Sequence, residues 1–296
     1  MVYVIIGLIS VGLLLSATDF LDLKDKIPTD GDDELEGDDG DDWIAGLAGD
    51  DILSGEGGED LLAGGDGDDE LDGGPGDDIL SGGNGDDVLE GGPGDDNAFG
   101  GKGKDFVDGG PGEDFVDGGD QNDIVTGGDG DDEVVGGNGN DILQGGAGED
   151  RLFGGDGRDT MDGGDGDDVL NGIFDGTNDG LLGAEDTDNP DIMLGGLGND
   201  IFYIGEKDVV TGGEGEDSFV LGSWIQDGRD AEITDYDEDE DEIIIVYDPL
   251  KSGLADIETR DKDGDTEVLF NGMAVATVKG VNLDGSAIKV LAQQLA

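Results

Sequence analysis

The chain has 296 residues, of which 79 are Asp or Glu and only 13 are Lys or Arg, so its formal net charge at pH 7 is −66. Nucleic acids and anionic membranes are bound through basic patches, so we expect no nucleic-acid partner for a chain this acidic. Histidine and cysteine are both absent. Their absence excludes disulfides, thiolate nucleophiles, His-containing triads and the usual zinc sites. A disordered polyanion and a protein that binds many hard cations stay open.

The segment 1–18 contains no charged side chain and consists largely of Val, Ile and Leu. We predict a hydrophobic helix over residues 1–18 and a linker over residues 19–30. A membrane-spanning helix needs about 20 apolar residues, so the segment is of borderline length. A signal peptide would have a basic residue before the apolar run and a small-x-small cleavage site, which Leu15-Ser16-Ala17 matches poorly. Three alternatives stay open: an uncleaved membrane anchor, a signal peptide and a buried helix.

A nine-residue repeat follows. An aspartate recurs at this interval from Asp33 to Asp168 with no slip, which defines sixteen repeats over residues 28–171. An apolar side chain stands two residues after every one of these aspartates, as Leu71 does after Asp69. From Gly64 onward, a Gly-Gly pair opens each repeat. A solvated polyanion has no reason to keep such an interval, so the pattern favours a folded repeat protein over a disordered one.

The repeat predicts an all-β solenoid. The three residues after each aspartate alternate around one apolar side chain, as a very short strand does. The six residues before them are rich in Gly, Asp and Asn, which tolerate tight turns. A single strand of this kind cannot bury its apolar side chain, so successive units must stack. Two nonapeptides then form one coil, with two parallel sheets facing each other and a column of turns along each edge.

The stacked turns predict calcium. Within one column, aspartates two repeats apart lie one strand spacing from each other, about 4.8 Å. Carboxylates this close repel each other unless a cation lies between them. Calcium accepts six to eight oxygen ligands, including main-chain carbonyls, in forgiving geometry, whereas magnesium demands a stricter octahedron. We therefore expect multiple Ca²⁺ ions, and at most 14 in the strict block, because each column of eight aspartates has seven gaps.

A clean copy of the repeat is Gly82-Gly83-Asn84-Gly85-Asp86-Asp87-Val88-Leu89-Glu90. It resembles the Gly-Gly-x-Gly-x-Asp-x-U-x nonapeptide of RTX, or hemolysin-type, calcium-binding proteins. The resemblance implies a right-handed parallel β-roll over residues 31–222, with calcium between stacked turns. Positions two, four and six of one repeat, with positions one, three and six of the repeat two further on, would supply the oxygens. Only the aspartate at position six would use its side chain.

Two sites follow from this resemblance. One would use Gly65, Gly67 and Asp69 with Gly82, Asn84 and Asp87, and the other Gly74, Gly76 and Asp78 with Gly91, Pro93 and Asp96. The remaining candidate ligands are aspartates at position six: Asp51, Asp60, Asp105, Asp114, Asp123, Asp132, Asp141, Asp150, Asp159, Asp168, Asp200 and Asp217. We expect weaker sites in the first four repeats, which lack the Gly-Gly pair, and at Gln121, which replaces a glycine. Asp86, at position five, is expected to point outward without binding metal.

The periodicity breaks over residues 172–190 and restarts at Asp191. Residues 195–203 and 212–220 are complete repeats, although Asp208 follows Asp200 after eight residues instead of nine. We therefore predict a roll that is interrupted over residues 172–190.

Residues 223–296 are predicted to form a small C-terminal β cap. Expected strands cover residues 231–234, 243–247, 268–270 and 273–278, and Asn271-Gly272 is a strong hairpin signal between the last two. Residues 261–265 are expected to form a turn, because the glycine is misplaced for an EF-hand and Gly272 stands where that loop needs Glu. The resemblance also implies a secretion signal in this region, read by type I secretion machinery.

The favoured hypothesis is a non-enzymatic calcium-binding repeat protein that folds on meeting calcium outside the cell, with a structural or surface role. Its expected location is extracellular or at the cell surface, with residues 1–18 as a membrane anchor in one alternative. A secreted hydrolase or toxin using the roll as an export and folding module is the alternative from another class. It would need an effector domain, for which residues 19–30 leave no room.

Overall fold

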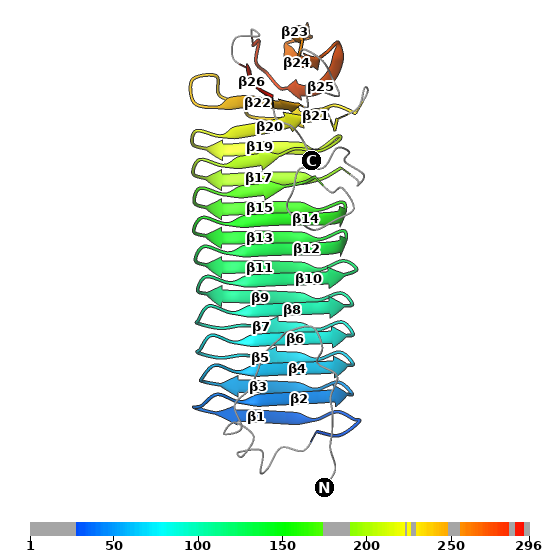
Figure 1. Cartoon of the computed structure of the whole chain (residues 1–296), viewed down its shortest axis with the longest axis vertical. Helices are drawn as coiled ribbons and strands as arrows, with labels where there is room; N and C mark the ends of the chain where they lie inside the picture. The colour runs from blue at the N-terminus through cyan, green and yellow to red at the C-terminus, as the bar shows by residue number, and fades with distance from the viewer. Residues whose placement is uncertain are drawn as a thin grey trace.

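The computed structural model describes residues 28–173, 190–222, 224–225, 229–247, 255–283 and 288–292. All regular structure in these residues is β-strand, and most of the strands form one parallel β-solenoid (Figure 1). No helix in this part of the chain is long and apolar enough to cross a membrane. The predicted hydrophobic helix over residues 1–18 lies outside the described residues.

From β1 to β22, strands alternate between two sheets along the chain, so successive nonapeptides contribute to opposite faces of each coil. The 14-stranded sheet has the order β1 (Glu34–Asp38), β3 (Ile52–Glu56), β5 (Glu70–Asp72), β7 (Val88–Glu90), β9 (Phe106–Pro111), β11 (Ile124–Asp129), β13 (Ile142–Ala147), β15 (Thr160–Asp165), β17 (Ile192–Leu197), β19 (Val209–Glu214), β21 (Ala231–Ile233), β25 (Met273–Val278), β24 (Asp265–Phe270) and β23 (Ile257–Lys262). The 12-stranded sheet has the order β2 (Trp43–Ala48), β4 (Leu61–Asp66), β6 (Ile79–Asn84), β8 (Asn97–Lys102), β10 (Phe115–Asp120), β12 (Glu133–Gly139), β14 (Arg151–Gly157), β16 (Val169–Asn171), β18 (Ile201–Tyr203), β20 (Ser218–Gly222), β22 (Glu242–Tyr247) and β26 (Ile288–Ala292).

Most strands of the roll are longer than the three residues expected. β8, for example, has six residues and continues through Gly100-Gly101. The glycines extend the ladder because their main chains pair with the coils on either side, as Gly101 does with Gly83 and Gly119. Each such nonapeptide therefore combines a longer strand with a turn confined to positions four to six.

The core of the roll lies between the two sheets, and each sheet contributes one inward column of apolar side chains. Every predicted core residue from Ile44 to Leu170 is buried, whereas Leu35 in the first coil is only partly buried. Ala98, the smallest side chain at a core position, is also buried. The residues on either side of each core position point to solvent, which gives the alternation expected of a strand buried on one face.

The break in the sequence repeat does not break the stack. Thr160 in β15 pairs with Ile192 in β17, although the two lie much further apart in the sequence than two repeats. The coil that contains β17 therefore follows the coil of β15 in register. The one-residue deletion before Asp208 is absorbed in the same way, since Ile192 pairs with Val209, which is one residue closer than two full repeats.

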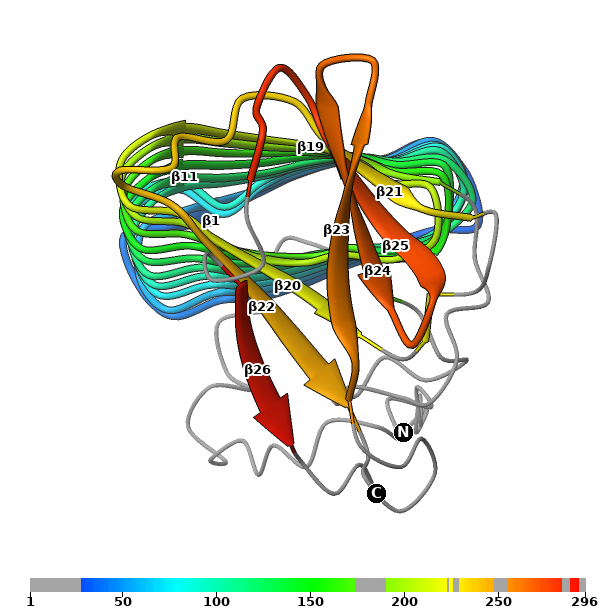
Figure 2. The same cartoon turned by 90° about the horizontal axis from the view of Figure 1, so that it is seen from above.

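The C-terminal strands extend both sheets beyond the last repeat. β21 and β22 continue the parallel ladders, and β25, β24 and β23 add two antiparallel hairpins at one end of the roll (Figure 2). Asn271 and Gly272 have φ angles of 52° and 80°, so the predicted Asn-Gly hairpin is confirmed. Asp263 and Gly264 form the other turn, as expected for residues 261–265. β23 and β26 were not predicted.

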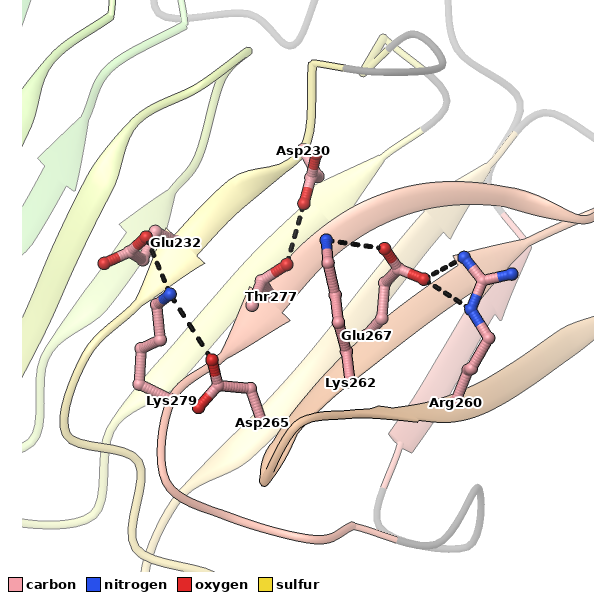
Figure 3. A network of polar contacts seen from close by, with 8 residues as sticks. All are labelled: Asp230, Glu232, Arg260, Lys262, Asp265, Glu267, Thr277 and Lys279. Atoms are coloured by element: carbon pink, nitrogen blue, oxygen red, sulfur yellow. Dashed lines mark hydrogen bonds and ion pairs between the residues drawn. The ribbon is translucent and has the colours of Figure 1, made fainter.

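Basic side chains compensate acids in this C-terminal region (Figure 3). Glu267 in β24 is buried and forms ion pairs with Arg260 and, at 3.0 Å, with Lys262 of the neighbouring strand β23. Its hydrogen bond from Lys262 is the main reason that the pKa of Glu267 lies below its usual value. Lys279 bridges Glu232 and Asp265 at 3.2 and 3.5 Å. These strands therefore carry counter-charges of their own.

Candidate metal sites

The aspartates at position six form two ladders, one along each edge of the roll. In each ladder, the main-chain N–H of one aspartate donates to Oδ1 of the aspartate one coil further on. Asp69 donates to Asp87 at 2.8 Å, and Asp78 donates to Asp96 at 2.6 Å. These aspartates are buried from Asp51 onward, whereas Asp33 and Asp42 are only partly buried. The ladders thus hold carboxylates at a regular interval in the interior of the turns.

From Asp51 to Asp168 and in Asp200, the second oxygen of these carboxylates has no hydrogen-bond partner within the described residues. It is buried in Asp51, Asp60, Asp69, Asp78, Asp87, Asp96, Asp105, Asp114, Asp123, Asp132, Asp141, Asp150, Asp159, Asp168 and Asp200. Burying an unpaired carboxylate oxygen is costly, and a series of them along one edge adds mutual repulsion. A cation that binds these oxygens would remove both penalties.

The glycine at position one leaves space beside each of these oxygens. A Cβ atom added to Gly73 would lie 2.6 Å from Asp78 Oδ2 and 2.6 Å from the carbonyl oxygen of Gly91 in the next coil. A Cβ atom on Gly100 would lie 2.6 Å from Asp105 Oδ2 and 2.6 Å from Gly118 O. The repeat thus places a carboxylate oxygen and a carbonyl oxygen around the same space, which the Cβ atom of any residue other than glycine at position one would fill.

The structure brings the six residues of each predicted site together across adjacent coils. In the second site, the N–H groups of Gly74 and Gly76 donate to the carbonyls of Gly91 and Pro93 at 3.1 and 2.9 Å. In the first site, Gly67 donates to the carbonyl of Asn84 at 2.8 Å. Gly65 pairs with Gly83, beside Gly82. Their role as ligands stays a prediction, but the donor set that they offer consists of oxygen alone.

Positions two and four have a left-handed backbone, with φ of 125° at Gly65 and 142° at Gly67. This conformation disfavours side chains, which explains the glycines there. Three departures from the pattern keep it nonetheless: Leu47, Glu56 and Gln121 have φ of 88°, 72° and 89°. The third and fourth repeats and the repeat that contains Gln121 therefore adopt the same turn at the cost of backbone strain.

Within the described parts of the chain, no three Asp or Glu side chains converge to form an all-carboxylate metal site. The predicted sites would need two carboxylates each, and main-chain carbonyls would complete the coordination. The fit of calcium thus depends on the turns as much as on the acidic residues.

Burial raises the pKa of the ladder carboxyls from Asp51 to Asp168. The pKa of Asp60 is raised to about 6, and those of Asp123 and Asp141 to about 7. Loss of solvation is the main cause, neighbouring carboxylates in the ladder add to it, and the main-chain hydrogen bond opposes it. These positions thus favour a positive partner, either a proton or a metal ion.

The ladders include aspartates that were not predicted as site residues. Asp159 N donates to Asp191 Oδ1 at 2.8 Å and Asp191 N donates to Asp208 Oδ1 at 2.9 Å, so one ladder crosses the break in the repeat. The other ladder continues from Asp217 to Asp241 at 3.0 Å. Asp208 differs because its Oδ2 accepts a hydrogen bond from Gly205 at 2.6 Å. The restart of the repeat at Asp191 was the available signal in the sequence.

Position five also has a structural role, which the sequence did not predict. Asp86 is exposed, as expected, but its Oδ1 accepts the N–H of Lys104 one coil further on at 2.9 Å, and its own N–H donates to Asp68 at 2.8 Å. Asn140 repeats the arrangement, accepting from Arg158 at 3.0 Å. At position five, the side chain accepts an N–H of the next coil, whereas at position six it accepts an N–H of the preceding coil. This hydrogen bond explains the short polar side chains at position five.

The fold and the turns define a class of protein: a parallel β-solenoid whose stacked turns present oxygen donors to cations. A model of the RTX calcium-binding nonapeptide repeat matches residues 28–62, 54–89, 63–98, 81–116, 90–125, 99–134, 108–143 and 135–170. Residues 28–170 are therefore RTX calcium-binding nonapeptide repeats.

Comparisons of the whole chain with known proteins give less information than the repeat does. No curated protein matches the chain. Among solved structures, it is similar to the extracellular lipase LipA from Serratia marcescens, with a TM-score of 0.25 and 14% sequence identity. That match covers 84% of this chain and 42% of the lipase, so the chain spans less than half the length of that protein.

Neutralising one ladder aspartate should distinguish bound calcium from a diffuse counter-ion atmosphere. In Asp123→Asn, the amide oxygen can still accept the N–H of Asp105, and the amide nitrogen is placed near the Gly136 carbonyl. We expect the calcium concentration at the folding midpoint to rise roughly threefold or more, because a charged ligand is lost. Circular dichroism during a calcium titration measures this midpoint.

Glu90→Gln is the matched control, because it removes one negative charge from an exposed position at the end of β7, outside the ladders. Its midpoint should stay unchanged or fall slightly through reduced repulsion. Equal shifts in the two variants would mean that calcium acts only as a diffuse counter-ion.

Proposed function

We propose that the protein is a non-enzymatic, extracytoplasmic calcium-binding protein whose roll folds as calcium binds between its stacked turns. The observation that carries this proposal is the ladder of buried carboxylates whose second oxygens, within the described residues, lack a hydrogen-bond partner and lie beside a carbonyl of the next coil. Metal binding of this kind is coupled to folding, because the oxygens converge only in the folded chain.

The proposed location follows from the calcium concentrations that such sites need. Extracellular calcium modules bind at about 10⁻⁴–10⁻³ M, far above the level at which a cytosolic site must work. A roll of this kind would remain unfolded inside the cell and fold outside it. In this view, the folded roll acts as a structural or surface element, and the C-terminal strands cap it and take part in export by type I secretion machinery.

Calcium stoichiometry tests the proposal. The purified chain, stripped with chelator and dialysed against millimolar calcium, is expected to hold many ions per chain, up to about 14 in the strict block by the ligand arithmetic of stacked turns. Equilibrium dialysis with metal analysis gives the number. A value of one or two ions per chain would contradict the proposal.

Location and activity are tested separately. Antibody detection should find the protein in the culture medium or the cell envelope, and cytoplasmic protein alone would contradict the proposed location. Assays of the calcium-loaded protein for hydrolase and cell-lysis activity should be negative. Activity that co-purifies with the chain would instead support the alternative of a secreted enzyme or toxin.

A further inference from the structure

An apolar ladder runs along the outer face of the 14-stranded sheet. It consists of the position-seven side chains Val88, Phe106, Ile124, Ile142 and Ile192, which pair strand by strand with Thr160 between the last two. These five side chains are between 37% and 48% exposed. Every large hydrophobic side chain that is exposed in the described coils from β1 to β20 lies on this sheet. A one-sided apolar surface of this extent indicates an interaction site.

An acidic groove lies on the same face of the sheet. Its volume is about 480 Å³, and its floor is formed by the position-two glycines of β9, β11, β13 and β15. Asp108, Asp129 and Asp162 line it together with Thr126 and Gln144. Asp108 follows Phe106 in β9 with its side chain on the same outer face, so the groove runs beside the ladder. The face thus combines an apolar stripe with a parallel stripe of negative charge.

We propose that this face docks a basic amphipathic α-helix of a partner protein, with apolar side chains on the ladder and Lys or Arg side chains in the acidic groove. Charge complementarity identifies the partner, because the chain carries a net charge of −66 and would repel both a second copy and an anionic membrane. Apolar anchors along one side of an amphipathic helix are a recurring way in which an apolar surface is recognised.

The dimensions of the ladder match a helix. In this sheet, the six neighbouring strands β7, β9, β11, β13, β15 and β17 are separated by five strand spacings, about 24 Å in all. A helix of about 16 residues has the same length. Apolar residues on one side of a helix recur every three to four positions, about 5 Å, close to the strand spacing of about 4.8 Å. Residues on one side of an extended strand recur every two positions, about 6.8 Å, and would lose register with the ladder.

Binding of a designed peptide tests the proposal. The probe is a fluorescent Lys/Leu peptide of helical periodicity and about 18 residues, titrated with the calcium-loaded full chain and followed by anisotropy. We expect saturable binding that weakens with salt. A scrambled peptide of the same composition should bind at least about tenfold more weakly, because it lacks a continuous apolar face. Equal binding of both peptides would reduce the effect to general attraction by a polyanion and overturn the proposal.

Matched variants locate the site. The double variant Ile124→Ser/Ile142→Ser should weaken binding about tenfold, because two exposed side chains of the ladder lose apolar contact. Ile52→Ser is the control: Ile52 has the same position and is similarly exposed, but Glu70 separates it from the ladder. Equal losses in both would overturn the proposal. Asp108→Asn/Asp162→Asn should weaken binding and flatten its salt dependence, and an unchanged salt dependence would contradict the role of the groove.

Two further measurements exclude other causes. Each variant should keep the calcium midpoint of the original chain, which shows that the roll has folded. Sedimentation of the calcium-loaded chain should show no self-association that depends on Ile124 and Ile142. Such self-association would identify the face as an interface between copies and overturn the proposal, as would equal binding to neutral lipid vesicles.

Discussion

Calcium removal at about pH 7.5 is expected to unfold the repeat block almost completely. Each coil adds buried carboxylates one strand spacing from those of its neighbours, and burial has already raised the pKa of Asp123 and Asp132 to about 7. The free-energy cost of ionising whole ladders of such groups without a counter-charge should exceed the stabilisation that the narrow apolar core supplies. Circular dichroism in EDTA should show little β signal, and titration with calcium to about 10 mM should restore it.

Magnesium at the same concentration is the control for this prediction. It demands stricter geometry and retains its waters, so it should restore much less β signal than calcium does. Sodium chloride at matched ionic strength controls for screening of surface charge. A full β signal in EDTA would show that the ladders are stable without metal, and would remove the coupling between calcium and folding.

The raised pKa values also give this unfolding a pH dependence. A carboxyl whose pKa is raised by folding binds its proton more tightly in the folded chain, so the folded state loses stability as pH rises. For Asp96 and Asp141 the pKa rises from 3.8 to about 7, so the loss occurs between about pH 4 and pH 7. Calcium-free chain should therefore regain β structure on acidification toward about pH 4, whereas calcium-loaded chain should not gain from it.

The sequence predicted the periodic part of the molecule because one period specifies both the core and the turns. The period places the side chain of Leu89 in the core, and it places the aspartate two residues before Leu89 at the end of the turn. The spacing of two repeats between stacked aspartates then follows from two strands per coil. The buried ladder and the two alternating sheets were therefore predictable without knowledge of any individual contact.

The features of the roll that the sequence did not predict depend on contacts between coils. Position five looks like a solvated acid in the sequence, and only stacking shows that Asp86 accepts the N–H of Lys104. Three-residue strands were expected because the other six residues of the repeat, rich in Gly, Asp and Asn, tolerate tight turns, yet main-chain pairing between coils extends β8 through Gly101. Asp191 and Asp208 were recognised as part of the resumed repeat but were not predicted as site residues, because an insertion and a deletion change their spacing in the sequence while keeping the register in space.

The C-terminal strands follow a different physical principle from the repeats. In the repeats, the buried aspartates from Asp51 to Asp168 have raised pKa values, and we expect a metal ion to supply their positive partner at neutral pH. In β23 to β25, Arg260 and Lys262 pair with Glu267 (Figure 3). We therefore expect these strands to need no calcium for their own charge balance, which makes them the natural starting point for a stack that grows coil by coil.

Deleting residues 223–296 should accordingly raise the calcium needed for folding by a large factor or abolish cooperative folding. The deletion would expose Phe219, which stacks on Phe202 at 5.3 Å between ring centroids and contacts Tyr236 at 6.0 Å. It would also remove Trp224, which is buried and donates its indole N–H to the carbonyl of Ile204 at 2.8 Å. Terminal coils of a solenoid without a cap expose apolar side chains and unpaired strand edges.

Deleting residues 1–55 is the matched control at the other end. It removes the coils in which Leu35, Asp33 and Asp42 are only partly buried, and in which Leu47 has a left-handed backbone. The shortened roll should keep a sharp calcium transition near the original midpoint, measured by circular dichroism. Trp224→Ala is a milder test, and a buried aromatic truncation of this kind costs about 3–5 kcal/mol. If the C-terminal deletion folds at the same calcium concentration as the full chain, residues 223–296 do not stabilise the roll, and of the two roles proposed for them only export remains.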